Sequence, residues 1–138
     1  MKCVILAGGL GSRLAEETEV RPKPMVEVGN RPILWHIMKL YEHFGVREFC
    51  IALGYKGEEI KRYFMDYRAL GGNLSIAMRS GKVDMHETEV EDWTVDLIDT
   101  GLRTGTGGRI RRLRSHLSGG TFMVTYGDGV GDVDIAAL

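Results

Sequence analysis

One stretch near the N-terminus constrains the fold more than any other. Four apolar residues, Val4-Ile5-Leu6-Ala7, run directly into a loop with three glycines that closes with a hydroxyl and a guanidinium, Gly8-Gly9-Leu10-Gly11-Ser12-Arg13. A continuous apolar run that ends at glycine is typical of a strand covered on both faces, as in a parallel sheet. The stretch therefore predicts a buried strand followed by a tight loop.

The glycine loop has the composition of a phosphate-binding turn. Its glycines allow several backbone N–H groups to point into one small volume, and Arg13 adds a forked, charged donor. The loop is not a Walker A motif, because no glycine is followed by Lys and then Ser or Thr. It is also a poor dinucleotide fingerprint, because Gly9-Leu10-Gly11-Ser12-Arg13-Leu14 lacks the third glycine. Taken alone, the loop fits a ligand-free strand-to-helix turn equally well.

The next segment favours the phosphate interpretation. Lys23 lies between Pro22 and Pro24, in the run Arg21-Pro22-Lys23-Pro24-Met25. Prolines on both sides predict stiff, extended backbone, which presents the ammonium with less freedom than an ordinary surface lysine has. A solvated turn lysine is the alternative.

Composition sets limits on the class of protein. The chain has 138 residues, enough for one modest domain with a core, and its content of 43% hydrophobic and 27% charged residues is that of a globular protein. A net charge of −1 gives no overall attraction to nucleic acid or to an anionic membrane, and no apolar run approaches the length of a membrane span. The expected partners therefore include neither nucleic acid nor membrane.

The two cysteines indicate a compartment. Cys3 and Cys50 both fall in predicted buried strands, and their spacing is not that of a metal site. We interpret them as free core thiols in a reducing cytoplasm, with a disulfide as the less favoured alternative. The N-terminal apolar stretch is too short for a secretory signal, which agrees with a cytoplasmic location.

Hydrophobic periodicity predicts alternating helices and strands. Strands are expected at 48–53, 74–78, 93–98 and 121–125, helices at 32–44 and 57–67, and an exposed polar excursion with solvated acidic residues at 82–92. His36, inside the first of these helices, is interpreted as a structural histidine because it has no clear catalytic partner. This alternation predicts an α/β fold: a Rossmann-like, mostly parallel sheet with flanking helices.

A second loop rich in glycine and hydroxyl groups spans residues 99–109 and carries Thr104 and Arg109. Loops at the carboxyl ends of parallel strands converge on one crevice, so this loop is expected to face the first across a ligand. Four arginines lie within six residues at its end, which invites a nucleic-acid interpretation that the net charge does not support. Arg109 differs from the others because it follows Gly107-Gly108 at the expected helix start, where anions are favoured.

Asp128 is the candidate metal ligand. The predicted strand at 121–125 leads into Tyr126-Gly127-Asp128-Gly129, which puts a carboxylate at a strand end between glycines. Mg²⁺ binds to few protein carboxylates and shares its remaining positions with phosphate and water. The alternative is an ordinary turn aspartate, since Asp-Gly is a common turn dipeptide.

Several motifs together resemble a known family, the sugar-phosphate nucleotidyltransferases, and within it the glucose-1-phosphate cytidylyltransferase branch. The first motif is typical of the superfamily, and the later ones are typical of the cytidylyl branch. They are Leu6 to Leu14, Arg21-Pro22-Lys23-Pro24-Met25-Val26-Glu27-Val28-Gly29, Pro32 to Met38, Asp99-Thr100-Gly101, Thr106-Gly107-Gly108-Arg109 and Tyr126-Gly127-Asp128-Gly129-Val130.

The resemblance implies a GT-A-like fold, and transfer of CMP from CTP to α-D-glucose 1-phosphate with Mg²⁺, giving CDP-glucose and pyrophosphate. This reaction belongs to nucleotide-sugar biosynthesis, including that of lipopolysaccharide O-antigen, and relatives associate as homo-oligomers. In this interpretation Lys23 and Arg13 are catalytic and Asp128 holds the metal and contacts the substrate. The remaining nucleotide contacts come from Leu6, Ala7, Gly8, Gly9, Leu10, Gly11, Ser12, Thr104 and Arg109.

Family members are considerably longer than this chain. We therefore expect residues 1–138 to be one nucleotide-binding domain, apparently truncated within a helix at its C-terminus, with the second metal carboxylate and most of the sugar site lying beyond it. Three alternatives stay open from the sequence. They are a non-catalytic nucleotide-binding or assembly module, a nucleotidyltransferase that uses UTP or dTTP, and a dinucleotide oxidoreductase domain.

Overall fold

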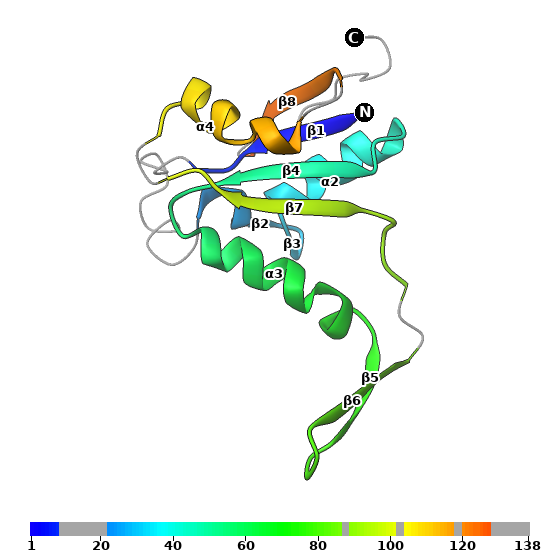
Figure 1. Ribbon diagram of the computed structural model, residues 1–138. Helices are drawn as coiled ribbons and strands as arrows, with labels where there is room; N and C mark the ends of the chain where they lie inside the picture. The colour runs from blue at the N-terminus through cyan, green and yellow to red at the C-terminus, as the bar shows by residue number, and fades with distance from the viewer. Residues whose placement is uncertain (9–21, 87–88, 102–103, 118–119, 128–138) are drawn as a thin grey trace.

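Four parallel strands form the central sheet of the computed structural model, which describes residues 1–8, 22–86, 89–101, 104–117 and 120–127 (Figure 1). In spatial order the strands are β7 (Thr94–Asp99), β4 (Glu48–Leu53), β1 (Lys2–Leu6) and β8 (Phe122–Tyr126). Ile5 of β1 lies opposite Ile51 on one side and Thr125 on the other. The expected α/β fold with a mostly parallel sheet is thus confirmed.

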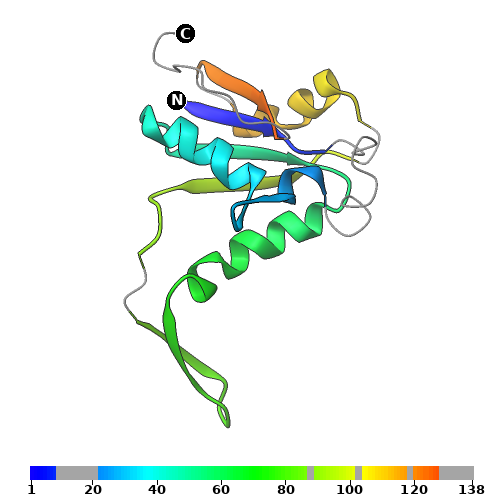
Figure 2. The ribbon, with the colours of Figure 1, turned by 180° about the vertical axis from the view of Figure 1, so that it is seen from behind.

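Helices cover both faces of this sheet (Figures 1 and 2). Helices α2 (Ile33–His43) and α3 (Gly57–Leu70) pack on one face, and α4 (Thr106–Arg112) packs on the other. Because side chains alternate along a strand, Cys3 and Ile5 enter the first core while Val4 and Leu6 enter the second. All four are buried, which explains the uninterrupted apolar run in the sequence.

Strand β8 is more exposed than the sequence suggests. We expect a buried strand at this position, but Val124 is 41% and Tyr126 61% exposed. In the described part of the chain β8 pairs only with β1 and stands at the edge of the sheet, so one of its sides is uncovered there.

A short connection links η1 (Lys23–Met25), β2 (Glu27–Val28) and β3 (Arg31–Pro32) to the start of α2. Its turn needs left-handed backbone at Gly29 and Asn30, with φ of 59° and 71°. The ring Nε2 of His36 lies 2.7 Å from the carbonyl oxygen of Val28. His36 is therefore held by the fold, as its structural interpretation predicts. After α4 the chain continues through the short 3₁₀ turn η2 (Arg114–His116).

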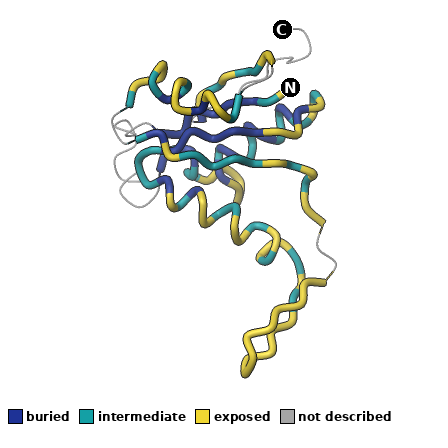
Figure 3. Tube along the Cα trace, viewed as in Figure 1, coloured by how far each residue is buried: buried dark blue, intermediate teal, exposed yellow. Residues whose placement is uncertain are grey.

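A two-stranded hairpin extends away from the sheet and is exposed along most of its length (Figures 1 and 3). Its strands are β5 (Asn73–Ala77) and β6 (Lys82–His86). The expectation of an exposed excursion is right about exposure but misses β6, whose alternation of Val83 and Met85 with charged residues is a strand pattern. Pairing sets Met85 opposite Leu74 and Val83 opposite Ile76, on the same side of the ribbon.

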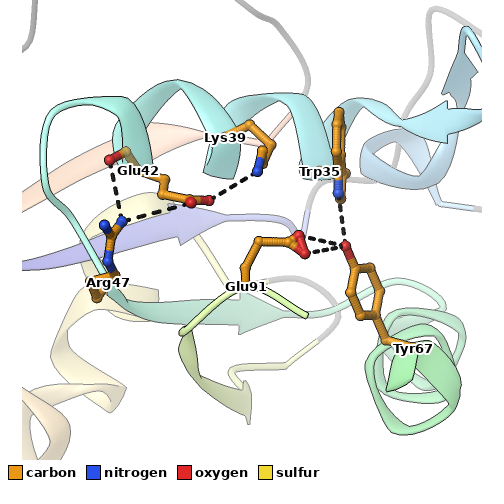
Figure 4. A network of polar contacts seen from close by, with 6 residues as sticks. All are labelled: Trp35, Lys39, Glu42, Arg47, Tyr67 and Glu91. Carbon is orange, nitrogen blue, oxygen red and sulfur yellow. Dashed lines mark hydrogen bonds and ion pairs between the residues drawn. The ribbon is translucent and has the colours of Figure 1, made fainter. Parts of the chain in front are cut away.

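Polar contacts hold the returning chain, which is the segment between the hairpin and β7, against α3 and α2 (Figure 4). The hydroxyl of Tyr67 donates to the carboxylate of Glu91, at 2.6 and 2.8 Å from its two oxygens, and accepts from the indole N–H of Trp35 at 3.0 Å. Burial, aided by the Glu91 carboxylate, raises the pKa of Tyr67 to about 12. Glu91 is therefore a structural acceptor, which corrects its interpretation as a solvated acid. At the far end of α2, Glu42 pairs with Lys39 at 3.3 Å and Arg47 at 3.8 Å.

No helix within the described ranges combines the length and the apolar character needed to cross a membrane.

The two cysteines generate a direct test of the core. Both are free and fully buried, and burial raises the pKa of Cys3 to about 12 and that of Cys50 to about 11. Because thiolate is the reactive form, neither thiol should react with a thiol reagent at mildly alkaline pH while the chain is folded. Labelling followed by mass spectrometry should show both thiols modified only in concentrated guanidinium chloride. Rapid labelling of either cysteine in the folded chain would contradict the packing described here.

Candidate functional site at the carboxyl edge of the sheet

The strand order singles out one position along the carboxyl ends of the strands. From β1 the chain adds β4 and then β7 on one side, and later places β8 on the other side of β1. The order therefore reverses between β1 and β8. In open parallel sheets, ligands bind outside the carboxyl ends of the strands at such a reversal. The candidate site is accordingly the region that follows Leu6 and Tyr126.

The segment that carries Lys23 packs against this position. The amide of Gly127 donates to the carbonyl of Leu6 at 3.0 Å, which closes the ends of β8 and β1 together. A methyl group added to Gly127 would lie 3.2 Å from Ile5 Cγ2 and 3.3 Å from Pro24 Cγ. Pro24 thus lies directly over the junction of the two strands, and the half-buried Lys23 precedes it. Tertiary packing, which the sequence does not show, places this lysine at the reversal point.

The backbone at Lys23 differs from the extended form that its flanking prolines predict. Pro22 is extended, with φ of −69° and ψ of 155°, but Lys23 begins a single 3₁₀ turn closed by a 2.9 Å bond from the Met25 amide to the Pro22 carbonyl. Proline tolerates the first turn of a helix because its missing N–H would have no partner there. The segment around Lys23 is therefore a single 3₁₀ turn and not an extended stretch, but a proline on each side of Lys23 still restricts its backbone.

Arg109 reaches the same edge from α4 and bonds to the ends of three strands. Its guanidinium donates to the carbonyls of Leu53 at 3.3 Å, Gly101 at 2.9 Å and Gly8 at 2.9 Å, and to the hydroxyl of Thr100 at 2.8 Å. These residues lie at or just after the ends of β4, β7 and β1. Arg109 is only 6% exposed. It is the fourth residue of α4 and not the helix start, which corrects the expected basis for its anion binding.

Two glycines make room for this guanidinium. A methyl group on Gly8 would lie 2.0 Å from one terminal nitrogen of Arg109 and 2.3 Å from its central carbon. A methyl group on Gly54 would lie 2.7 Å from the same nitrogen and 2.7 Å from the carbonyl oxygen of Gly8. The space beside Gly8 is therefore filled by an arginine of the chain itself. The sequence predicts that the loop glycines turn N–H groups toward a phosphate, whereas at Gly8 the missing side chain makes room for Arg109.

The guanidinium of Arg109 is buried but remains positively charged. Burial lowers the pKa of Arg109, the nearby Arg112 guanidinium lowers it further, and the carboxylate of Asp99 acts in the opposite direction. Arginine begins so far above neutrality that it stays protonated. Arg112 itself donates to the carbonyl of Thr100 at 2.6 Å. Two guanidiniums therefore hold the segment after β7.

The structure brings part of the predicted set together. Leu6 and Ala7 are buried at the end of β1 and lead into Gly8, which Arg109 contacts. Within the second loop Thr104 lies beside Gly101, since a methyl group on Gly101 would be 2.6 Å from the Thr104 hydroxyl. Six further predicted residues lie outside the described residues, namely Gly9, Leu10, Gly11, Ser12, Arg13 and Asp128.

Sequence reasoning names Thr100 in the motif Asp99-Thr100-Gly101 but gives it no role in the site. It is a fully buried polar residue whose hydroxyl donates to the Leu53 carbonyl at 2.8 Å while accepting from Arg109. The available signal was its place directly after a predicted strand and before Gly101. Among the residues that the structure describes, no group of three or more His, Cys, Asp or Glu side chains could hold a metal ion.

Known proteins are similar to this chain in sequence and in fold. A family model described as "Nucleotidyl transferase" matches residues 2–90. The glucose-1-phosphate cytidylyltransferase of Salmonella typhimurium is 51% identical over 138 residues, which is 99% of this chain and 54% of that enzyme. A probable glucose-1-phosphate cytidylyltransferase of Bacillus subtilis is 44% identical over all of this chain and 54% of its own length. The chain thus spans about half the length of these relatives.

A solved structure supports the same assignment. HddC from Yersinia pseudotuberculosis superposes with a TM-score of 0.69 at 29% identity, over 92% of this chain and 47% of that protein. The observed parallel sheet, with glycines just after its strands, is consistent with the family match over residues 2–90. The chain belongs to the nucleotidyl transferase family.

Proposed function

We propose that this chain is the nucleotide-binding part of an enzyme that transfers CMP from CTP to α-D-glucose 1-phosphate, releasing CDP-glucose and pyrophosphate. The observation that carries the proposal is the convergence of Gly8, the Lys23 segment and the end of β8 at the reversal point of a parallel sheet. Similarity to two glucose-1-phosphate cytidylyltransferases supplies the choice of substrates. In this proposal residues 1–138 act as one domain.

The chemistry needs alignment and charge neutralisation more than covalent work by the protein. A phosphate oxygen of glucose 1-phosphate attacks the α-phosphorus of CTP, a new P–O bond forms, and the bond to the pyrophosphate leaving group breaks. The N–H groups of residues 8–12 and the guanidinium of Arg13 would hold the triphosphate, together with the backbone of Leu6 and Ala7. Lys23 would neutralise the charge that develops in the transition state. Thr104 and Arg109 are the remaining proposed members of the nucleotide site.

Mg²⁺ is the metal that we propose for this site, with the Asp128 carboxylate as its protein ligand. The described end of β8 reaches the Leu6 carbonyl through Gly127, and Asp128 follows in the sequence. One carboxylate beside a polyphosphate is how proteins commonly bind Mg²⁺, with phosphate and water filling the other positions. Asp128 would hold the ion, which supplies neutralisation of phosphate charge when bound.

The base is the least constrained element of the proposal. HddC has also been solved in complex with GMP-PN, at 31% identity and a TM-score of 0.64, so this fold accepts a guanine nucleotide in a relative. A cytidine preference here rests on the two cytidylyltransferases, and UTP or dTTP are the alternatives. A non-catalytic nucleotide-binding module would keep the same edge and bind without turnover. The family match removes the case for a dinucleotide oxidoreductase.

Location, assembly and pathway follow from the same proposal. Two buried free thiols favour a reducing cytoplasm. Exposed apolar side chains on the hairpin, such as Ile76 and Val83, favour association into a homo-oligomer. The product would enter nucleotide-sugar biosynthesis, with lipopolysaccharide O-antigen as the proposed destination.

Nucleotide preference can be measured directly on this chain. Titration calorimetry with Mg²⁺ present should show CTP binding more tightly than UTP, dTTP or ATP. NAD should give no thermal shift while CTP raises the melting temperature, because a ligand that binds only the folded state stabilises it. Equal affinity for all four triphosphates would contradict the cytidine preference and leave only a general nucleotide site.

Lys23 should matter for binding and turnover more than for folding. Lys23→Ala should leave the circular dichroism spectrum and urea midpoint close to those of the wild type. It should weaken CTP binding by about tenfold or more, as loss of one charge-assisted contact predicts. It should also abolish any pyrophosphate release with glucose 1-phosphate. Lys61→Ala, on the exposed face of α3, is the matched control. Unchanged affinity and turnover in Lys23→Ala would remove this lysine from the mechanism.

A further inference from the structure

We propose that Arg109 is a positioning residue of the nucleotide site: together with the buried Thr100 hydroxyl, its guanidinium fixes the ends of β1, β4 and β7 as one rigid edge, and it acts on the nucleotide through Gly8. This inference rests on the proposed nucleotide-binding function and assigns a mode of action that a direct phosphate contact does not include.

The first support is the reach of the side chain. Its hydrogen bonds join residues 101, 56, 9 and 8 positions away in the sequence, namely Gly8, Leu53, Thr100 and Gly101. Leu53 is the last residue of β4, and its carbonyl also accepts from the Thr100 amide at 2.8 Å, whereas Gly8, Thr100 and Gly101 lie just after the ends of β1 and β7. One planar group with several donors in fixed directions can hold all of these acceptors in a single geometry. A lysine ammonium has no such fork.

The second support is the space that the backbone leaves. Three guanidinium atoms of Arg109 are the nearest neighbours of a methyl group built on Gly8, at 2.0, 2.3 and 2.9 Å. The first residue of the phosphate loop is thus packed flat against this side chain. The guanidinium also donates to the Gly8 carbonyl at 2.9 Å, so it helps to set the position of Gly8, where the loop that is proposed to hold the triphosphate begins.

The third support is the buried hydroxyl of Thr100, which lies between Arg109 and the Leu53 carbonyl. Thr100 has no exposed surface, so it cannot touch a bound nucleotide. Its hydroxyl nevertheless completes a chain from Arg109 to the Leu53 carbonyl, at 2.8 Å for each bond. A change at Thr100 therefore alters the edge without altering any contact to ligand, which separates positioning from direct binding. Preorganised donors are effective because no energy is needed to arrange them when charge develops.

The experiment compares three variants of the full chain, Arg109→Lys, Thr100→Val and Thr100→Ser, with Arg111→Lys as control because Arg111 is exposed on the same helix. Calorimetry measures CTP affinity with Mg²⁺. Hydrogen exchange, measured without nucleotide, follows the amides of Ala7 and Thr100, which bond to the carbonyls of Ala52 and Leu53. The amides of Ile5 and Ile51, inside the strands, report global opening.

We expect Arg109→Lys and Thr100→Val each to lower CTP affinity by about tenfold, the usual consequence of losing one hydrogen bond to a charged group. Exchange at Ala7 and Thr100 should accelerate more than exchange at Ile5 and Ile51. Thr100→Ser keeps the hydroxyl and should restore affinity and local protection, and Arg111→Lys should match the wild type.

Two results would overturn the proposal. One is wild-type affinity and wild-type exchange in both Arg109→Lys and Thr100→Val. The other is lost affinity in Arg109→Lys with no effect of Thr100→Val and unchanged exchange, which would make Arg109 a direct ligand only. If the wild-type chain binds no nucleoside triphosphate, the proposed function fails separately, and the exchange measurement still decides whether Arg109 holds the edge.

A pair of glycine and arginine variants tests the packing itself. Gly8→Ala should lower the urea midpoint clearly in the wild-type background, because its methyl group and the guanidinium cannot occupy the same space. In an Arg109→Ala background the same change should cost much less, since the obstructing group is gone. Gly107→Ala, whose methyl group would meet no heavy atom within 4 Å, is the matched control and should be neutral or slightly stabilising. Additive effects of Gly8→Ala and Arg109→Ala would contradict the packing on which the proposal rests.

Discussion

A buried guanidinium at the carboxyl edge of the sheet holds the candidate site together. Arg109 is almost fully covered, and it bonds to the carbonyl group at the end of one strand and to carbonyl groups just after the ends of two others. Burying a charge is costly unless hydrogen bonds replace its water, and here backbone oxygens and the Thr100 hydroxyl do so. Neutral acceptors satisfy the donors without cancelling the positive charge. The edge is therefore both rigid and cationic, which suits a site for polyphosphate.

The strand order explains why the candidate site lies at the carboxyl ends of the strands. Parallel strands deliver all their carboxyl ends to the same side, and the order β7-β4-β1-β8 reverses beside β1. The described end of the β1 segment, up to Gly8, thus lies between two supports. Arg109 contacts it from the side of β4 and β7, and Pro24 packs at the junction with β8 on the other side. Lys23 is brought to this region because its neighbouring proline fills the space above Gly127.

Remote contacts keep the helices in place around this sheet. Tyr67 joins α3 to Trp35 of α2 and to Glu91 of the returning chain, and the hydroxyl acts as both donor and acceptor (Figure 4). The hairpin between α3 and Glu91 extends outward and contributes little to the main core (Figure 3). The chain thus separates a compact body of sheet and helices from an exposed arm.

The sequence by itself determined the class of fold and most of the elements. The run Val4-Ile5-Leu6-Ala7 predicts a two-sided strand because every residue in it is apolar, and helical spacing in α2 and α3 predicts those helices correctly. It also identified Gly8, Lys23 and Arg109 as residues of interest. Only the tertiary structure decided what Gly8 and Arg109 do to each other, that Thr100 bonds between Arg109 and the end of β4, and that Pro24 packs over Gly127. Local patterns encode periodicity and turns, whereas these contacts join residues far apart in the chain, and their pairing depends on strand order and space that no single segment records.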